Sequence, residues 1–170
     1  IQSYEMAYRM QAAATDAFDL SGEPAHIQKL YGSTKPAQQL LLARRLIERG
    51  VRFVQVWPYH NQPFDNHENL TSLEPVARHC DQAISALLTD LKMRGLLDET
   101  LVIWGGEFGR QPVSQQASPG QVASVSGRDH NPKGFTMWLA GAGVRPGAVG
   151  ETDELGMEAA VDRHHVRDLH

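Results

Sequence analysis

The stretch Thr100-Leu101-Val102-Ile103-Trp104-Gly105-Gly106-Glu107 indicates the class of fold. Its apolar part, 101–104, is uninterrupted and rich in β-branched and aromatic side chains, which is typical of a strand buried on both faces. Gly105 and Gly106 then allow a sharp turn at the carboxyl end of this strand. Because open α/β sheets bind ligands beyond the carboxyl ends of their strands, Glu107 stands where chemistry is expected.

The segments on either side predict alternating helices and strands. Apolar residues recur at helical spacing over 36–48, and the β-branched and aromatic run at 51–57 predicts a strand directly after this helix. A broad apolar face over 72–94 predicts a helix that covers a sheet, and 135–140 predicts a further strand. The expected fold class is therefore α/β.

Composition limits the kinds of protein that this chain can be. A length of 170 residues with 41% hydrophobic and 21% charged residues suits a single globular domain. The net charge of −4, with lysines and arginines scattered, predicts no nucleic-acid partner. Cys80 is the only cysteine, so no intramolecular disulfide can form. Apolar runs fall short of the roughly 20 residues of a membrane helix, so no membrane partner is expected.

Both ends of the chain lack the usual signals of a start or a stop. The first residue is Ile1 and the last is His170. We expect residues 1–170 to be the C-terminal portion of a single domain that is truncated at both ends. An exported protein, periplasmic or extracellular, is compatible with this reading.

Three polar clusters lie in loops next to predicted strands. The first cluster is Asp65-Asn66-His67, the second is Glu107-Phe108-Gly109-Arg110, and the third is Gly127-Arg128-Asp129-His130. Divalent ions such as zinc bind carboxylate oxygens and imidazole nitrogens, and a catalytic ion needs about three protein ligands. Asp65, His67 and His130 would suffice.

A purely structural alternative explains the same residues. Asp65 would cap the helix that begins near Ser72, and His67 would be a surface imidazole. Glu107 and Asp129 would form salt bridges with the arginines of their own clusters. The residues alone leave both interpretations open.

The three motifs in this order resemble the signature of an uncharacterised sulfatase-like family of the alkaline phosphatase superfamily, over nearly the whole chain. That family usually has Trp-Asp-Thr-His in its first motif and Thr-Pro after its second, where this chain has Phe64, Asn66 and Gln111. These changes spare the ligand-type residues. The resemblance implies an alkaline phosphatase-like three-layer sandwich with a central, mostly parallel sheet, here without its N-terminal strands.

The resemblance also implies a metal-dependent hydrolase of phosphate or sulfate esters, acting on a small-molecule or glycan ester. One or two divalent ions, zinc, calcium or magnesium, would be held by Asp65, His67, Glu107, Asp129 and His130. Arg110 and Arg128 would clamp the anionic ester, because a guanidinium can bind an oxyanion in a bidentate manner.

Two departures weaken the expectation of activity in these residues alone. The superfamily often has His or Asn where this chain has Phe108, which cannot bind a metal. No segment before Asp65 resembles the strand that carries the family's nucleophile, so residues 1–170 alone are expected to be inactive. Two alternatives therefore stay open: a non-catalytic domain that binds an anion or glycan, and a mutase that transfers phosphoryl groups.

Overall fold

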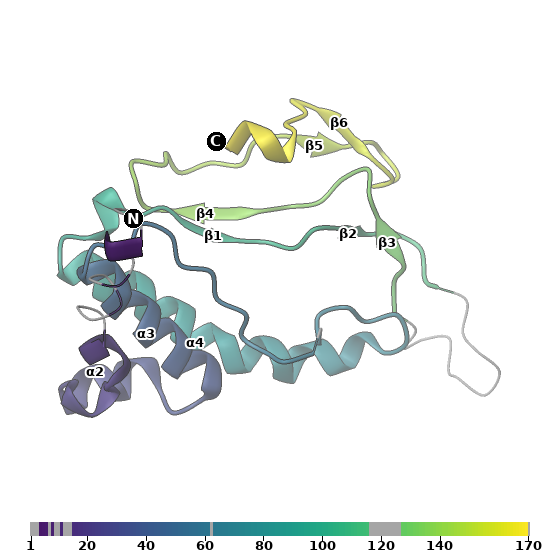
Figure 1. The fold of residues 1–170 in the computed structure, drawn as a ribbon. Helices are drawn as coiled ribbons and strands as arrows, with labels where there is room; N and C mark the ends of the chain where they lie inside the picture. Colours follow the sequence, from purple (N-terminus) through teal and green to yellow (C-terminus); the bar gives the residue numbers. More distant parts are fainter. Residues whose placement is uncertain are drawn as a thin grey trace. The chain divides into compact units, whose positions relative to one another are not determined.

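The computed structural model describes most of the chain as two compact units (Figure 1). The described residues are 4–6, 8, 11, 15–61, 63–115 and 127–169. The first unit comprises the described residues within Ile1–Gln62 and Pro75–Leu97, and the second those within Pro63–Glu74 and Asp98–His170. All three polar clusters belong to the second unit.

The first unit is helical. Thr34 begins α3 by accepting a hydrogen bond at Oγ1 from the backbone N–H of Ala37, at 3.2 Å. The α4 side chains Ala83, Leu87 and Leu91 are buried at helical spacing. The elements are η1 (Thr15–Phe18), η2 (Leu20–Gly22), α2 (Ala25–Tyr31), α3 (Lys35–Glu48) and α4 (Leu73–Met93), whose first two residues belong to the second unit.

The expected helices over 36–48 and 72–94 are confirmed as α3 and α4. The strand predicted at 51–57 is wrong, because these residues have no regular secondary structure. Phe53 and Trp57 are 80% and 68% exposed. Strand propensity mainly reflects packing against neighbouring strands, and among the described residues this segment has no strand partner.

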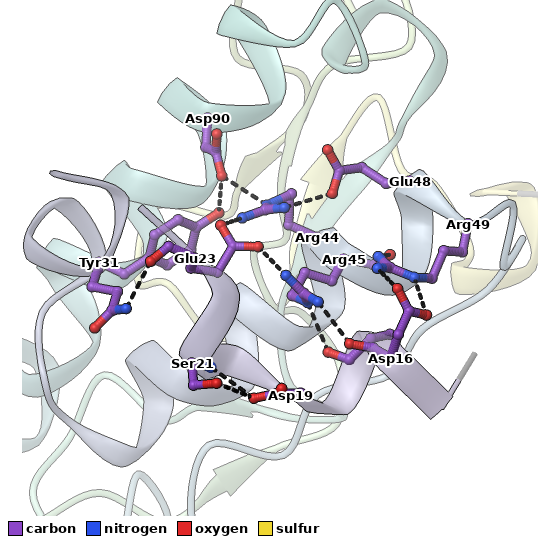
Figure 2. Close-up of polar contacts among 12 residues, drawn as sticks. Asp16, Asp19, Ser21, Glu23, Tyr31, Arg44, Arg45, Glu48, Arg49 and Asp90 are labelled. Atoms are coloured by element: carbon purple, nitrogen blue, oxygen red, sulfur yellow. Dashed lines mark hydrogen bonds and ion pairs between the residues drawn. The ribbon is translucent and has the colours of Figure 1, made fainter. Parts of the chain in front are cut away.

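Arg44 lies within α3, yet its side chain is only 1% exposed. Its guanidinium forms ion pairs with Glu23 at 2.5 Å, with Glu48 at 2.5 Å and with Asp90 at 2.8 Å (Figure 2). These carboxylates come from the end of η2, from α3 and from α4. A buried charge is stable only when it is paired and hydrogen-bonded, so these three segments must pack around Arg44.

Neighbouring side chains extend this buried network (Figure 2). Arg45 also pairs with Glu23, and its Nε donates a hydrogen bond to the carbonyl oxygen of Ala17 at 2.8 Å. The hydroxyl of Tyr31 donates to the carboxylate of Asp90 at 3.1 Å. Burial, followed by the charge of Asp90, raises the pKa of Tyr31. The hydroxyl therefore stays neutral, and the network connects η1, η2, α2, α3 and α4.

The second unit contains short antiparallel strand pairs. In the β1–β4 pair, Val102 lies opposite Ala140 and Trp104 lies opposite Trp138. The elements are η3 (Leu70–Ser72), η4 (Leu97–Glu99, which begins in the first unit), β1 (Val102–Trp104), β2 (Gly109–Arg110), β3 (His130–Asn131), β4 (Trp138–Ala140), β5 (Glu151–Thr152), β6 (Ala159–Val161) and η6 (Val166–Leu169). β2 pairs with β3, and β5 pairs with β6.

The structure confirms a mixed α/β composition and corrects the expected sheet. The predicted strand at 101–104 is found as β1, and part of 135–140 is found as β4. All strand pairs among the described residues are antiparallel, so the central, mostly parallel sheet is not found in this part of the chain. Ile103 and Trp104 are 46% and 39% exposed, so the expected burial of this strand on both faces is wrong.

Within the described part of the chain, no helix has both the length and the apolar character needed to cross a membrane.

Removing one carboxylate of the Arg44 network should destabilise the first unit. The Asp90→Ala variant leaves the buried Arg44 guanidinium with one counter-charge fewer, and we expect a loss of about 3 kcal/mol in the free energy of unfolding. Urea denaturation followed by the helical circular dichroism signal measures this loss. Asp81→Ala, an exposed change on the same helix, should stay within about 0.5 kcal/mol of the parent protein. Equal losses in both variants would contradict the role of the network.

Stability should also depend on the ionisation of Glu23. Burial raises the pKa of this carboxyl, but the hydrogen bonds from Arg44 and Arg45 outweigh burial, and the net pKa is lowered from 4.5. A carboxyl whose pKa is depressed on folding stabilises the folded state above its unfolded pKa, and this contribution disappears as the pH falls through the folded pKa. The urea midpoint should therefore fall on acidification below about pH 4.5. Glu23→Gln should lower the midpoint at neutral pH and flatten this acid dependence, and an unchanged acid profile would refute the assignment.

Candidate metal site

Strand pairing brings the second and third clusters together. In the β2–β3 pair, Arg110 lies opposite His130. The backbone N–H of Gln111 extends the pairing by donating to the carbonyl oxygen of Asp129 at 2.9 Å. Two clusters about twenty residues apart in sequence are therefore held in a fixed register.

Gly127 allows the first cluster to approach the third. Gly127 is buried. A Cβ atom at this position would collide with the backbone of Asn66 and His67 and would lie 2.7 Å from the backbone nitrogen of Glu68. The next N–H, that of Arg128, donates to the carbonyl oxygen of Asn66 at 3.3 Å. The missing side chain is required by this close approach of two backbones.

The loop of the first cluster is shaped by its own asparagines. Oδ1 of Asn66 accepts hydrogen bonds from the backbone N–H groups of Glu68 and Asn69 at 3.1 and 2.6 Å, which closes a tight turn. Oδ1 of Asn69 caps η3 by accepting from the N–H of Thr71 at 3.0 Å. Since Asn69 fills the capping role, the side chain of Asp65 is left to point elsewhere.

Asp65, His67 and His130 converge. Oδ1 of Asp65 lies 3.0 Å from Nε2 of His67 and 2.7 Å from Nε2 of His130, and the two nitrogens are 3.3 Å apart. Ligands that bind zinc tetrahedrally at about 2.0–2.1 Å are separated by roughly 3.3 Å. One carboxylate oxygen and two imidazole nitrogens at such separations fit a divalent metal ion.

Asp65 is charged at neutral pH. Hydrogen bonds from His130 and then from Arg110 lower the pKa of its carboxyl to about 2, against a smaller opposing effect of burial. Nη2 of Arg110 donates to Oδ1 at 2.6 Å, and the same guanidinium donates to the carbonyl oxygens of Phe64 and Arg128. Arg110 therefore holds the carboxylate in its ionised form and in position.

Gln115 orients His67, and sequence reasoning missed this residue. Its Oε1 lies 2.8 Å from Nδ1 of His67. An amide oxygen only accepts, so Nδ1 donates in this hydrogen bond. Nε2, the other ring nitrogen, lies 3.0 Å from Oδ1 of Asp65. A ring held with Nδ1 as the donor can bind a metal ion through Nε2.

Phe108 stacks on His130. The ring centroids are 5.0 Å apart with an interplanar angle of 10°, while the rings of His130 and His67 are 4.8 Å apart and tilted by 53°. In the sequence, Phe108 was notable only as a residue that cannot bind a metal. The stacking indicates that it fixes the plane of the imidazole.

The remaining predicted site residues lie around this group. Oδ1 of Asp129 is 3.7 Å from Nδ1 of His67 and accepts from the N–H of His130 at 2.7 Å. Arg128 donates to Oγ of Ser114 at 2.9 Å. Glu107 is exposed and lies outside the group of close ligand atoms among the described residues. Metal binding by Asp129 and Glu107, and substrate binding by Arg110 and Arg128, stay predictions.

These features define a mixed α/β protein with a carboxylate and imidazole cluster that could hold a metal ion. The family described as Protein of unknown function (DUF1501) matches residues 1–170, so the chain belongs to that family. No curated protein and no solved structure matches the chain.

The hydrogen bond from His67 to Gln115 should strengthen metal binding. Replacing Gln115 with Leu removes the acceptor that fixes the tautomer, and we expect zinc affinity to fall by about 10- to 100-fold. Gln115→Glu keeps an acceptor near Nδ1 and should retain most of the affinity. Calorimetric titration with zinc measures both variants, and the ¹⁵N chemical shifts of His67 report its tautomer. Equal affinities for the Leu variant and the parent would contradict this role.

Proposed function

We propose that this protein is a metal-dependent hydrolase of phosphate or sulfate esters. The observation that carries the proposal is the convergence of Asp65, His67 and His130, whose ligand atoms all lie within 4.8 Å of one another. Three protein ligands with a further position open is the arrangement typical of catalytic zinc sites. The order of the three motifs, which resembles a sulfatase-like family, supports the same proposal.

The donor set favours a particular kind of ion. Two imidazole nitrogens suit zinc and similar transition metals, whereas calcium and magnesium prefer ligands that are all oxygen. The chemistry that such an ion supplies when bound is polarisation of the ester oxygen and stabilisation of the charge that develops on it. We therefore propose zinc or a related transition metal as the first ion to test.

The chain's own residues would hold and orient this site. Asp65 supplies a carboxylate that stays ionised, and Arg110 anchors it. The side chains of Asp65, His67 and His130 are 31%, 32% and 36% exposed, so a substrate could reach them from solvent. Arg128 would contribute positive charge for an anionic ester.

Two observations support a second candidate, a non-catalytic domain that binds an anion or glycan. Phe108, at the place where related hydrolases often have a metal ligand, is occupied by stacking on His130. The guanidinium of Arg110 is occupied by Asp65 and two backbone carbonyl groups. A single ion without a nucleophile would bind an ester without cleaving it. A phosphoryl-transferring mutase would need the same site and would be recognised by its products.

Metal content tests the proposal first. Plasma mass spectrometry of protein purified without chelator should find about one divalent ion per chain. Asp65→Ala and His130→Ala should lose it, because each removes one of three ligands. Glu154→Gln, an exposed carboxyl change in the same unit, should keep it. No metal above background in the parent protein would refute the proposal.

Hydrolysis separates the two candidates. A longer protein that contains these residues, loaded with zinc, should release nitrophenol from nitrophenyl phosphate or nitrophenyl sulfate, and Asp65→Ala should abolish the release. Metal binding without release of nitrophenol from either ester would favour the non-catalytic binding domain.

A further inference from the structure

A hollow lies within the first unit and shares no residue with the metal cluster. It has a volume of about 390 Å³. Its walls come from three segments: residues 34–36 at the start of α3, residues 58–61 of the following loop, and His79 on α4. Cavities of this size hold small organic ligands in proteins.

The side chains that line the hollow are basic or uncharged. The basic residues of the lining are Lys35, His60 and His79, and the lining includes no Asp or Glu. The hydroxyl of Tyr59, also in the lining, donates to the carbonyl oxygen of Val76 at 2.9 Å. The lining is therefore basic in a protein whose net charge is −4.

Several arginines of this unit are paired with carboxylates, whereas Lys35 contacts a histidine. Arg44, Arg45, Arg49 and Arg94 each form an ion pair with a carboxylate. The amine of Lys35 instead contacts Nε2 of His60. An imidazole cannot neutralise an ammonium group, so within the described lining this pair lacks a counter-charge.

We propose that this cavity binds the phosphate or sulfate group of a small organic molecule. A tetrahedral oxyanion accepts several hydrogen bonds at once and would supply the counter-charge that the lining lacks. Lysine is a common phosphate ligand because it supplies a compact point charge. The volume exceeds that of a bare oxyanion and leaves space for a small organic group. This inference is independent of the metal cluster, which lies in the other unit.

Binding can be followed at individual histidines. Protein kept in chelator, so that it carries no metal, is titrated with inorganic phosphate, inorganic sulfate and phenyl phosphate, and the imidazole resonances are recorded by NMR. The proposal predicts saturable shifts of His60 and His79 and none of His67 or His130. Lys35→Gln and His79→Gln should each weaken binding by about tenfold, since each removes one basic side chain from the lining. Comparison of the two inorganic ions shows whether phosphate or sulfate is preferred.

Controls separate this site from general charge effects. Lys92→Gln, an exposed change on α4 outside the lining, should bind like the parent, and sodium chloride at matched ionic strength should cause no saturable shift. Asp65→Ala should also bind like the parent, which distinguishes the cavity from the metal cluster. Shifts confined to His67 and His130, or equal binding by Lys35→Gln and the parent, would overturn the proposal.

Discussion

The first unit depends on the buried guanidinium of Arg44. Its three carboxylate partners come from the end of η2, from α3 itself and from α4, so the guanidinium links α3 to two other segments. The small side chains Ala37, Ala83 and Ala86 of α3 and α4 are also buried in this unit. Desolvating a guanidinium is costly, and the ion pairs offset that cost only when all of the segments are in place.

In the second unit the shared group is a carboxylate oxygen, whereas in the first unit it is a guanidinium. Oδ1 of Asp65 is shared by Arg110, His67 and His130, much as Arg44 is shared by three acids. However, about a third of the Asp65 side chain remains exposed, whereas Asp90 is closed off from water. The buried network can only hold the fold together, while the open one can exchange a partner. This difference in exposure separates a structural cluster from one suited to ligand binding.

Much of the local structure, and the core of the candidate site, follows from sequence patterns. Helical periodicity located α3 and α4, and the order of the three clusters pointed to Asp65, His67 and His130. The strand expected at 51–57 failed because strand formation needs a partner that local sequence does not specify. Gln115 escaped notice because a side-chain hydrogen bond across 48 residues leaves no periodic signal. Its position is fixed by a hydrogen bond from its backbone N–H to the carbonyl oxygen of Gly127, at 3.0 Å, which the sequence alone does not reveal.

The strand that indicated the fold class also affects how the protein behaves in solution. β1 pairs with β4 on one side, and among the described residues no strand covers its other edge. Ile103 and Trp104 of this strand are large apolar side chains that are 46% and 39% exposed. An open apolar edge of this kind is a template for a strand from another molecule. Pairing of β1 with a strand of a second molecule would therefore be one route to self-association at high concentration.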